Sequence, residues 1–424
     1  MKRAGSSVLS GALLRSPLSP IGRYSVSGRG QGGVVRPDPV NIQLVTGDTY
    51  FPNGPPVALG GSNTNGQGRN GHVVGPSKVK NIRFVDAHAY VAPGSGTETN
   101  SPAAACTWQR AAEKLTGINT PVRALYSGAN TGVSNPGELI FTDPIAGMEW
   151  DADTTNYSGF YRTVPLVTDG MSAVTNNGVG SAGFRTTGGS QLLRAGGGVL
   201  NNSGTSSGPA CPPAMVLGIP YVPMACVIGV LDSIGYFKDD TNTSSTQGFF
   251  ARAMRNVNGH CFPWHKQGID ANKIQNQMVA VAPVQKLLWP YVTDIFIQLG
   301  TNDISAGSDL ATMKARFLDL ADYARSTVGP YGCYLRVHAS SIIPRGTLTG
   351  AQNTVRNDYN AWLASGADGR VDKYHDIIAE AGDYNTYPND TIHPGPTPHA
   401  AMGAKVSAGM VPYVDPYFEA RLAA

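Results

Sequence analysis

The stretch MACVIGVLDSIGYF, Met224 to Phe237, decides the fold of the second half of the chain. Its first eight residues are almost all apolar or glycine, which is typical of a parallel-sheet strand covered on both faces. Asp-Ser-Ile-Gly then breaks the strand pattern at Ser233. Open α/β sheets bind ligands at the carboxyl ends of their strands, so Ser233 occupies a favourable position for chemistry. Because serines also cap turns and helices, its role depends on the residues that accompany it.

The sequence after residue 223 alternates between strand and helix patterns. Strands are predicted at 224–231, 293–300, 333–342 and 373–378, and helices at 246–256, 271–288, 308–328, 351–365 and 397–411. In the segment 308–328, Leu310, Met313, Phe317 and Leu320 recur at helical spacing, so this face is expected to pack on the sheet. The alternation predicts right-handed crossovers and a mostly parallel sheet of about five strands.

Residues 41–205 carry a different pattern, with short strand-like runs separated by Gly, Asn and Pro. Strands are predicted at 80–93, 122–128, 138–145 and 159–167, and one helix at 104–115. This β-rich region is predicted to form a sandwich or jelly roll. The residues 201–222 are predicted to be a loop-like boundary. Residues 1–40, rich in Arg, Ser and Gly, are expected to be an arm or linker that an assembly partner would hold.

Composition narrows the class of protein. A length of 424 residues allows two or three domains, and only 14% of them are charged, against about a quarter in ordinary domains. With 52 glycines, this balance favours an extracellular or virion-associated protein, such as part of a phage tail. A net charge of +3 gives no indication of nucleic-acid binding. No run approaches the roughly 18 apolar residues of a membrane span, and Arg15 interrupts any signal-peptide core.

The five cysteines are scattered without metal-ligand spacing, so neither a metal site nor a cofactor is predicted. The sequence does not decide whether Cys106 and Cys211 form a disulfide. Two short motifs are rejected for lack of context. The GxGxxG at 28–33 has no strand before it, and the GxSxG at 204–208 is flanked by polar loop and prolines. His265 lies close to Gly268 in the sequence and is a candidate to face the cleft. Trp264 and Trp289 are expected in the core.

Three further polar clusters follow predicted strands or precede the last helix. Gly300-Thr-Asn302-Asp303 follows one strand, Gly268 stands at another strand-to-helix turn, and Asp390 precedes His393 by three residues. Acyl transfer needs a nucleophile, a base, an anion that orients the base, and donors for the oxyanion. Ser233, His393 and Asp390 supply the first three. The backbone N–H groups of Ser233 and Gly268 and the side-chain amide of Asn302 would form the oxyanion hole.

These blocks, in this order, resemble the SGNH (GDSL-type) hydrolase family over residues 223–415. The nucleophile block corresponds to Leu231-Asp-Ser233, the Gly-x-Asn-Asp block to Gly300–Asp303, and the Asp-x-x-His-Pro block to Asp390–Pro394. The resemblance implies a flavodoxin-like three-layer α/β domain. Leu231 departs from the family's glycine, and the family's oxyanion glycine matches Gly268 only loosely, so Ala271 stays an alternative N–H donor.

The run Glu138–Leu166 also resembles the β-sandwich that precedes some SGNH esterases. The sequence therefore predicts a metal-independent serine esterase, acting on an O-acetyl group of a polysaccharide or glycan. Two alternatives stay open: a lipase or thioesterase of the same family, and a non-catalytic structural or glycan-binding protein that keeps the SGNH shell. The substrate-binding residues and the oligomeric state are not predicted.

Overall fold

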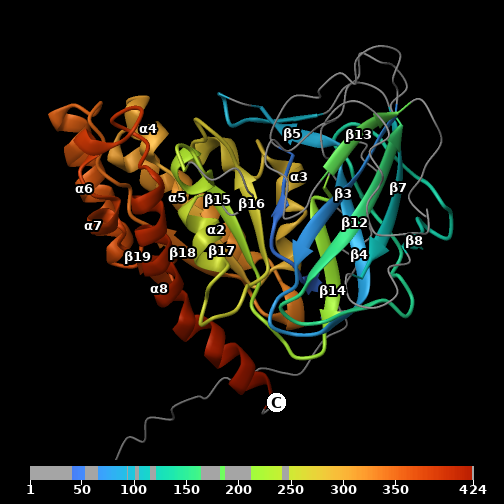
Figure 1. Cartoon of the computed structure of the whole chain (residues 1–424). Helices are drawn as coiled ribbons and strands as arrows, with labels where there is room; N and C mark the ends of the chain where they lie inside the picture. Colours follow the sequence, from blue (N-terminus) through green and yellow to red (C-terminus); the bar gives the residue numbers. More distant parts are fainter. Residues whose placement is uncertain are drawn as a thin grey trace, which may run out of the picture. The chain divides into compact units, whose positions relative to one another are not determined.

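The computed structural model describes residues 41–52, 65–92, 94–100, 105–114, 121–163, 182–186, 212–240 and 248–422. These residues belong to one compact unit, Val40–Ala424. They form two larger antiparallel sheets, one parallel sheet and a two-stranded hairpin (Figure 1). The predicted arm at 1–40, the two rejected glycine motifs and Cys211 lie outside the described residues, and Cys106 is a free thiol.

The parallel sheet carries the second half of the chain. Its strands are β2 (Thr49–Tyr50), β15 (Val227–Leu231), β16 (Trp264–Gly268), β17 (Asp294–Gln298), β18 (Arg336–Ser340) and β19 (Lys373–His375), in the order β19-β18-β17-β15-β16-β2. Every neighbouring pair is parallel. The predicted mixed α/β architecture with a parallel sheet is therefore confirmed. The sixth strand, β2, was not predicted because two residues carry no periodicity.

Strand β15 is buried on both faces, which explains its unbroken apolar sequence. Ile228 and Val230 belong to a core cluster that includes residues of α5 (Leu310–Ser326) and α6 (Gly350–Ala364). Val227 and Leu231 belong to a second cluster, with α2 (Phe249–Met254) and α8 (Pro396–Leu422). Because successive side chains of a strand point to opposite faces, the helices cover the sheet on both sides.

The predicted helices at 246–256, 308–328, 351–365 and 397–411 correspond to α2, α5, α6 and α8. The single helix predicted over 271–288 is wrong. This segment contains a 3-10 turn, Ile274–Gln277, and the short α3 (Pro283–Lys286). Proline lacks an N–H and fits a helix only in its first turn, so Pro283 starts α3 and cannot lie inside a longer helix. The remaining described helical segments are α1 (Ser233–Tyr236), α4 (Thr301–Ser305), α7 (Ile378–Ala381) and 3-10 turns at Trp289–Tyr291, Pro330–Gly332 and Tyr384–Thr386.

Two antiparallel sheets form in the first half of the chain. One contains β1 (Gln43–Leu44), β4 (Val79–Ala87), β10 (Leu139–Phe141), β11 (Glu149–Trp150) and β14 (Met215–Pro220); the other contains β3 (Asn65–Val73), β7 (Cys106–Glu113), β8 (Val122–Ala124), β9 (Gly132–Ser134), β12 (Thr155–Thr163) and β13 (Ala182–Thr186). Phe84 and Val216 of the first sheet share a buried cluster with Ala112 and Ala124 of the second. The sandwich or jelly roll stays a prediction.

Two local predictions in this half are wrong. The segment predicted as a helix at 104–115 contains strand β7, where buried Cys106, Trp108 and Arg110 alternate with half-buried Thr107 and Gln109. Its alanines and charged end favour a helix locally, but the alternation matches one buried sheet face. The predicted loop at 201–222 contains β14, which pairs with β1 and β4.

Strands β5 (Ala89–Val91) and β6 (Glu98–Asn100) form a separate hairpin, and Gly94–Gly96 lie in its tight turn. Of the helices that the structure describes, none combines the length and apolarity that crossing a membrane would need.

Close packing of β15 against α2 yields a first prediction. A Cβ on Gly229 would lie 2.7 Å from a ring carbon of Phe250. Gly229→Ala should therefore lower the free energy of unfolding by about 1–3 kcal/mol, because the well-packed core has to shift. Denaturant unfolding measures this effect. Gly350→Ala is the matched control, because its Cβ would meet nothing within 4 Å and should be neutral or stabilise by up to about 1 kcal/mol. Equal stability of the two variants would contradict the packing.

Candidate active site

Ser233 lies at the carboxyl end of the central strand, at the first position of α1. The side chain of Asp232 caps this helix, its Oδ1 accepting a hydrogen bond from the Ile234 N–H at 2.9 Å. From the end of β17, Gln298 Oε1 accepts the N–H of Gly235 at 2.9 Å. Two neighbouring strand ends thus fix the turn, and Ser233 keeps 6% of its surface exposed.

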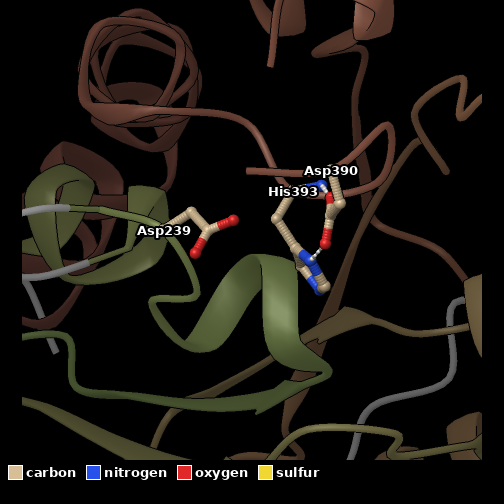
Figure 2. Close-up of side chains that lie close together, drawn as sticks. All are labelled: Asp239, Asp390 and His393. Carbon is tan, nitrogen blue, oxygen red and sulfur yellow. Dashed lines mark hydrogen bonds and ion pairs between the residues drawn. The ribbon is translucent and has the colours of Figure 1, made fainter. Parts of the chain in front are cut away.

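The predicted base and its orienting carboxylate meet Ser233 across the sheet end. His393 Nε2 lies 2.9 Å from Ser233 Oγ, and His393 Nδ1 lies 2.7 Å from Asp390 Oδ2. Figure 2 shows the Asp390 carboxylate along the edge of the imidazole ring. The three residues that the sequence grouped therefore form one continuous hydrogen-bonded chain, although 157 residues separate Ser233 from Asp390 in the numbering.

Asp390 is held in its ionised form. Burial raises its pKa, but hydrogen bonds from the His393 side chain and from the backbone N–H groups of His393 and Ile392 outweigh this effect, so that the pKa lies below its ordinary value. A carboxylate that stays charged at neutral pH can accept the Nδ1 proton of His393 and leave Nε2 facing the serine as an acceptor.

The loop that carries Asp390 and His393 is anchored to the loop after β18. The Gly346 N–H donates to the Thr391 carbonyl at 2.9 Å. A Cβ on Gly346 would lie 2.7 Å from the Thr391 side chain, so the two loops are in close contact. Arg345, which is buried, precedes this glycine. Burial lowers the pKa of Arg345, and the nearby carboxylates of Asp232 and Asp390 raise it by a smaller amount. Sequence reasoning missed Arg345, because it belongs to none of the family blocks.

The candidate oxyanion donors Asn302 and Gly268 come from the ends of β17 and β16, the two strands that flank β15. Asn302 lies in the first turn of α4, after β17, and its Nδ2 donates to the Asn272 carbonyl at 3.0 Å. An amide nitrogen carries two hydrogens, so one stays available for a second acceptor. Gly268 ends β16, where a Cβ would lie only 1.9 Å from the Leu231 carbonyl oxygen. This close approach to the nucleophile strand gives Gly268 a packing reason to be glycine.

Ala271, the alternative donor, has a left-handed backbone with φ of 62°. It lines the same groove as Asn302, and Gly268 is not among the residues that line this groove. Ser233 and His393 are not among the lining residues either, so the lining of this groove does not choose between the N–H groups of Ala271 and Gly268.

The loop from Gly268 to Asn276 is fixed by three side-chain hydrogen bonds that the sequence did not reveal. Buried Asn272 donates from Nδ2 to the Leu231 carbonyl at 2.8 Å. Asp303 Oδ2 accepts the Ile274 N–H at 3.0 Å, so Asp303 ties the loop to α4. Burial raises the pKa of Asp303. The hydrogen bond from the Ile274 N–H and the nearby cations lower this pKa, but by less. The third bond is the one from Asn302 to Asn272. An asparagine four residues after the end of β16 is the one signal that the sequence could have offered.

A second carboxylate, that of Asp239, lies close to the histidine. Asp239, Asp390 and His393 each offer a ligand atom, and these atoms lie within 4.8 Å of one another (Figure 2). Both ring nitrogens of His393 already have partners in Asp390 and Ser233. An ion bound by this imidazole would have to break one of those two hydrogen bonds.

Other residues considered in the sequence lie in the core. His265 is fully buried on β16, and burial lowers its pKa to about 3, so it does not face the site as a charged group. Trp264 and Trp289 are also fully buried, as expected of core residues.

No family model matches this chain, and no curated protein matches it. Its neighbours among solved structures include lipolytic proteins and carbohydrate esterases. A lipolytic protein of the G-D-S-L family from Veillonella parvula is 17% identical and covers 42% of this chain and 94% of its own, with a TM-score of 0.35. A carbohydrate acetylesterase family member from Sinorhizobium meliloti is 14% identical and covers 45% and 97%, with a TM-score of 0.36.

A family two carbohydrate esterase from Clostridium thermocellum, in complex with cellohexaose, is 14% identical and covers 88% of this chain and 98% of its own, with a TM-score of 0.34. The G-D-S-L family is the one that the sequence motifs resemble. At such identities and TM-scores, the chemistry of this site follows from its own geometry alone.

The buried cap of α1 yields a prediction on pH. Burial raises the pKa of Asp232 from its ordinary value to about 6, against hydrogen bonds and His393, which lower it. The protonated form is therefore favoured in the folded state, and its contribution to stability is lost as the pH rises from about 4 to above 6. Asn caps helices as well as Asp but does not ionise. The stability of Asp232→Asn relative to wild type should therefore rise by roughly 2 kcal/mol between pH 4 and pH 7. Urea unfolding at both pH values measures this difference, and a difference independent of pH would contradict it.

The left-handed conformation of Ala271 yields a prediction on stability. An L-residue with a Cβ is strained there, whereas glycine is not, so Ala271→Gly should stabilise the protein by about 1 kcal/mol. Ala315→Gly is the matched control. Ala315 is exposed within α5, and the substitution there should cost about 1 kcal/mol. Thermal unfolding that shows the same sign for both variants would contradict the assigned backbone strain.

Proposed function

We propose that the protein is a serine esterase in which Ser233 is the nucleophile, His393 the general base and Asp390 the residue that orients it. The observation that carries this proposal is the pair of hydrogen bonds from Ser233 Oγ to His393 Nε2, 2.9 Å, and from His393 Nδ1 to Asp390 Oδ2, 2.7 Å. Such a chain activates a hydroxyl that is otherwise a weak nucleophile.

The reaction proceeds in two half-reactions on these groups. His393 Nε2 takes the Ser233 Oγ proton as Oγ attacks the ester carbonyl, and the ionised Asp390 stabilises the resulting imidazolium. The imidazolium then protonates the alcohol oxygen as the carbon–oxygen bond of the ester breaks, which leaves an acyl group on Ser233. Water, deprotonated by the same imidazole, attacks this acyl-enzyme and releases the acid and the free serine.

The tetrahedral intermediates carry a negative oxygen that needs preorganised donors. The second hydrogen of Asn302 Nδ2 and the backbone N–H of Ser233, at the start of α1, support this role. Ala271 supplies the third donor in this proposal. Its place in the lining of the groove that Asn302 also borders supports this role, and Gly268, which packs closely on Leu231, is the alternative donor.

An O-acetyl group on a glycan is the substrate that we infer. The low fraction of charged residues and the many glycines fit an extracellular or virion-associated protein that meets polysaccharides. The catalytic chain itself is compatible with any carboxylic ester, so the size of the acyl group has to come from kinetics.

Hydrolysis of 4-nitrophenyl esters with acyl chains of two to eight carbons tests this proposal. The acetate should be the preferred ester, and Ser233→Ala should lower kcat by about 10⁴-fold or more, since it removes the nucleophile. Asp390→Asn should cause a large loss as well, because it no longer holds the imidazole in the required tautomer.

The outcomes separate the alternatives. Preference for long acyl chains would indicate a lipase or thioesterase. Folded wild-type protein without Ser233-dependent hydrolysis of any ester would instead support a structural or glycan-binding role. The folded state of each variant is checked by comparing its thermal unfolding with that of the wild type.

A further inference from the structure

An open groove begins beside the candidate oxyanion donors and runs towards the first half of the chain. It has a volume of about 540 Å³, and Ala271 and Asn302 belong to its lining. Its other walls come from the turn of the β5–β6 hairpin, from the loop at 271–276 and from the end of α4. Most of the side chains that line it are polar, and they include Ser95, Thr97, Lys273, Gln275, Asn276 and Ser305.

The hairpin turn is fixed against the loop that carries the oxyanion donors. Asn276 Nδ2 donates to the Ser95 carbonyl at 2.6 Å. Gly96 has a φ of 68°, and a Cβ there would lie 2.6 Å from the Cα of Asn272. Asn272 in turn bonds the end of the nucleophile strand through Leu231. The hairpin therefore packs directly on the frame of the active site.

The strand pair next to this turn is anchored as well. Both carboxylate oxygens of Glu98, the first residue of β6, accept backbone N–H groups at the start of α3, those of Val284 and Gln285, each at 2.9 Å. With its turn and the first residue of β6 both held, the hairpin forms a preformed wall. A preformed wall loses little conformational entropy when a ligand binds.

We propose that this groove binds the carbohydrate part of the ester, and that the β5–β6 hairpin of the first half of the chain is its specificity-determining wall. This inference rests on the proposed esterase activity at Ser233. The groove borders Ala271 and Asn302 but not Ser233 or His393, so a substrate whose carbonyl oxygen binds at Ala271 and Asn302 can extend from the nucleophile into it. The hydroxyl, ammonium and amide groups of the lining match the hydroxyls of a sugar. An aliphatic acyl chain would instead leave those polar groups desolvated without partners.

The first test removes polar groups from the groove. The double variant Lys273→Ala/Gln275→Ala is compared with wild type on O-acetylated xylo-oligosaccharides and on 4-nitrophenyl acetate. The ratio of kcat/KM for the oligosaccharide to that for the small ester should fall about tenfold or more, since two hydrogen-bonding groups are lost. Lys405→Ala is the matched control. Lys405 is an exposed lysine on α8 that pairs with Glu380, and its loss should leave the ratio unchanged.

The second test fills the groove from the hairpin side. Ser95→Trp should lower kcat/KM for the acetylated oligosaccharide more than for 4-nitrophenyl acetate. Ser326→Trp, at an exposed serine at the end of α5, serves as the control for adding a surface tryptophan. 4-Nitrophenyl octanoate is measured in parallel. If Ser95→Trp impairs the octanoate selectively and spares the oligosaccharide, the groove holds the acyl chain and the inference is overturned.

The two levels of the proposal fail in different ways. If hydrolysis of 4-nitrophenyl acetate depends on Ser233 but neither groove variant changes the oligosaccharide ratio, the esterase stands and the groove assignment is wrong. If no ester is hydrolysed in a Ser233-dependent manner, the proposed function fails, and the groove assignment fails with it.

Discussion

The hydrogen bond from the side chain of Asn272 to the carbonyl of Leu231, 2.8 Å long, is the contact on which the geometry of the site depends. It joins the strand that presents Ser233 to the loop that presents Ala271. The same asparagine accepts the Asn302 amide through its backbone carbonyl and meets Gly96 at its Cα. Because Asn272 is fully buried, each of these contacts is shielded from water, and an unpaired amide there would be costly. Ser233, the proposed oxyanion donors Ala271 and Asn302, and the hairpin therefore share one frame.

Backbone geometry at the strand ends imposes a second constraint. Gly268 and Gly300 have φ values of 125° and 123°, which side chains rarely allow. At Gly300 a Cβ would lie 2.5 Å from the Ile342 side chain, so this glycine lets the chain turn into α4 in tight packing. Asn302 follows two residues after this turn, and the turn therefore positions it at the site. The glycines that the sequence motifs emphasise thus act through the backbone, and the functional atoms belong to their neighbours.

Sequence alone predicted the parallel sheet and grouped Ser233, His393 and Asp390, which the structure joins by hydrogen bonds, because both features have local signatures. The buried run before Ser233 and the Asp-x-x-His spacing at Asp390 are short patterns with a direct physical meaning. Asn272 and Glu98 could not be found in this way, since their partners lie 41 and 186 residues away and neither partner is a side chain. The helix predicted over 104–115 failed for a related reason. Local alanine content favoured a helix, whereas pairing with β8 and β12, which the sequence does not display, made it a strand.

The two halves of the chain depend on one another more closely than their separate sequence patterns suggest. Strand β2 from the first half pairs with β16 and covers that edge of the parallel sheet, and unpaired edges are prone to association. Asp48, just before β2, forms an ion pair with Arg255, just after α2. Glu98 accepts the N–H groups that begin α3, which no preceding turn of helix could bond. An isolated second half would therefore lose an edge strand, a partly buried ion pair and a helix cap together. The first half is thus a structural part of the parallel sheet, and this coupling is the physical basis for the proposal that its hairpin forms a wall of the groove.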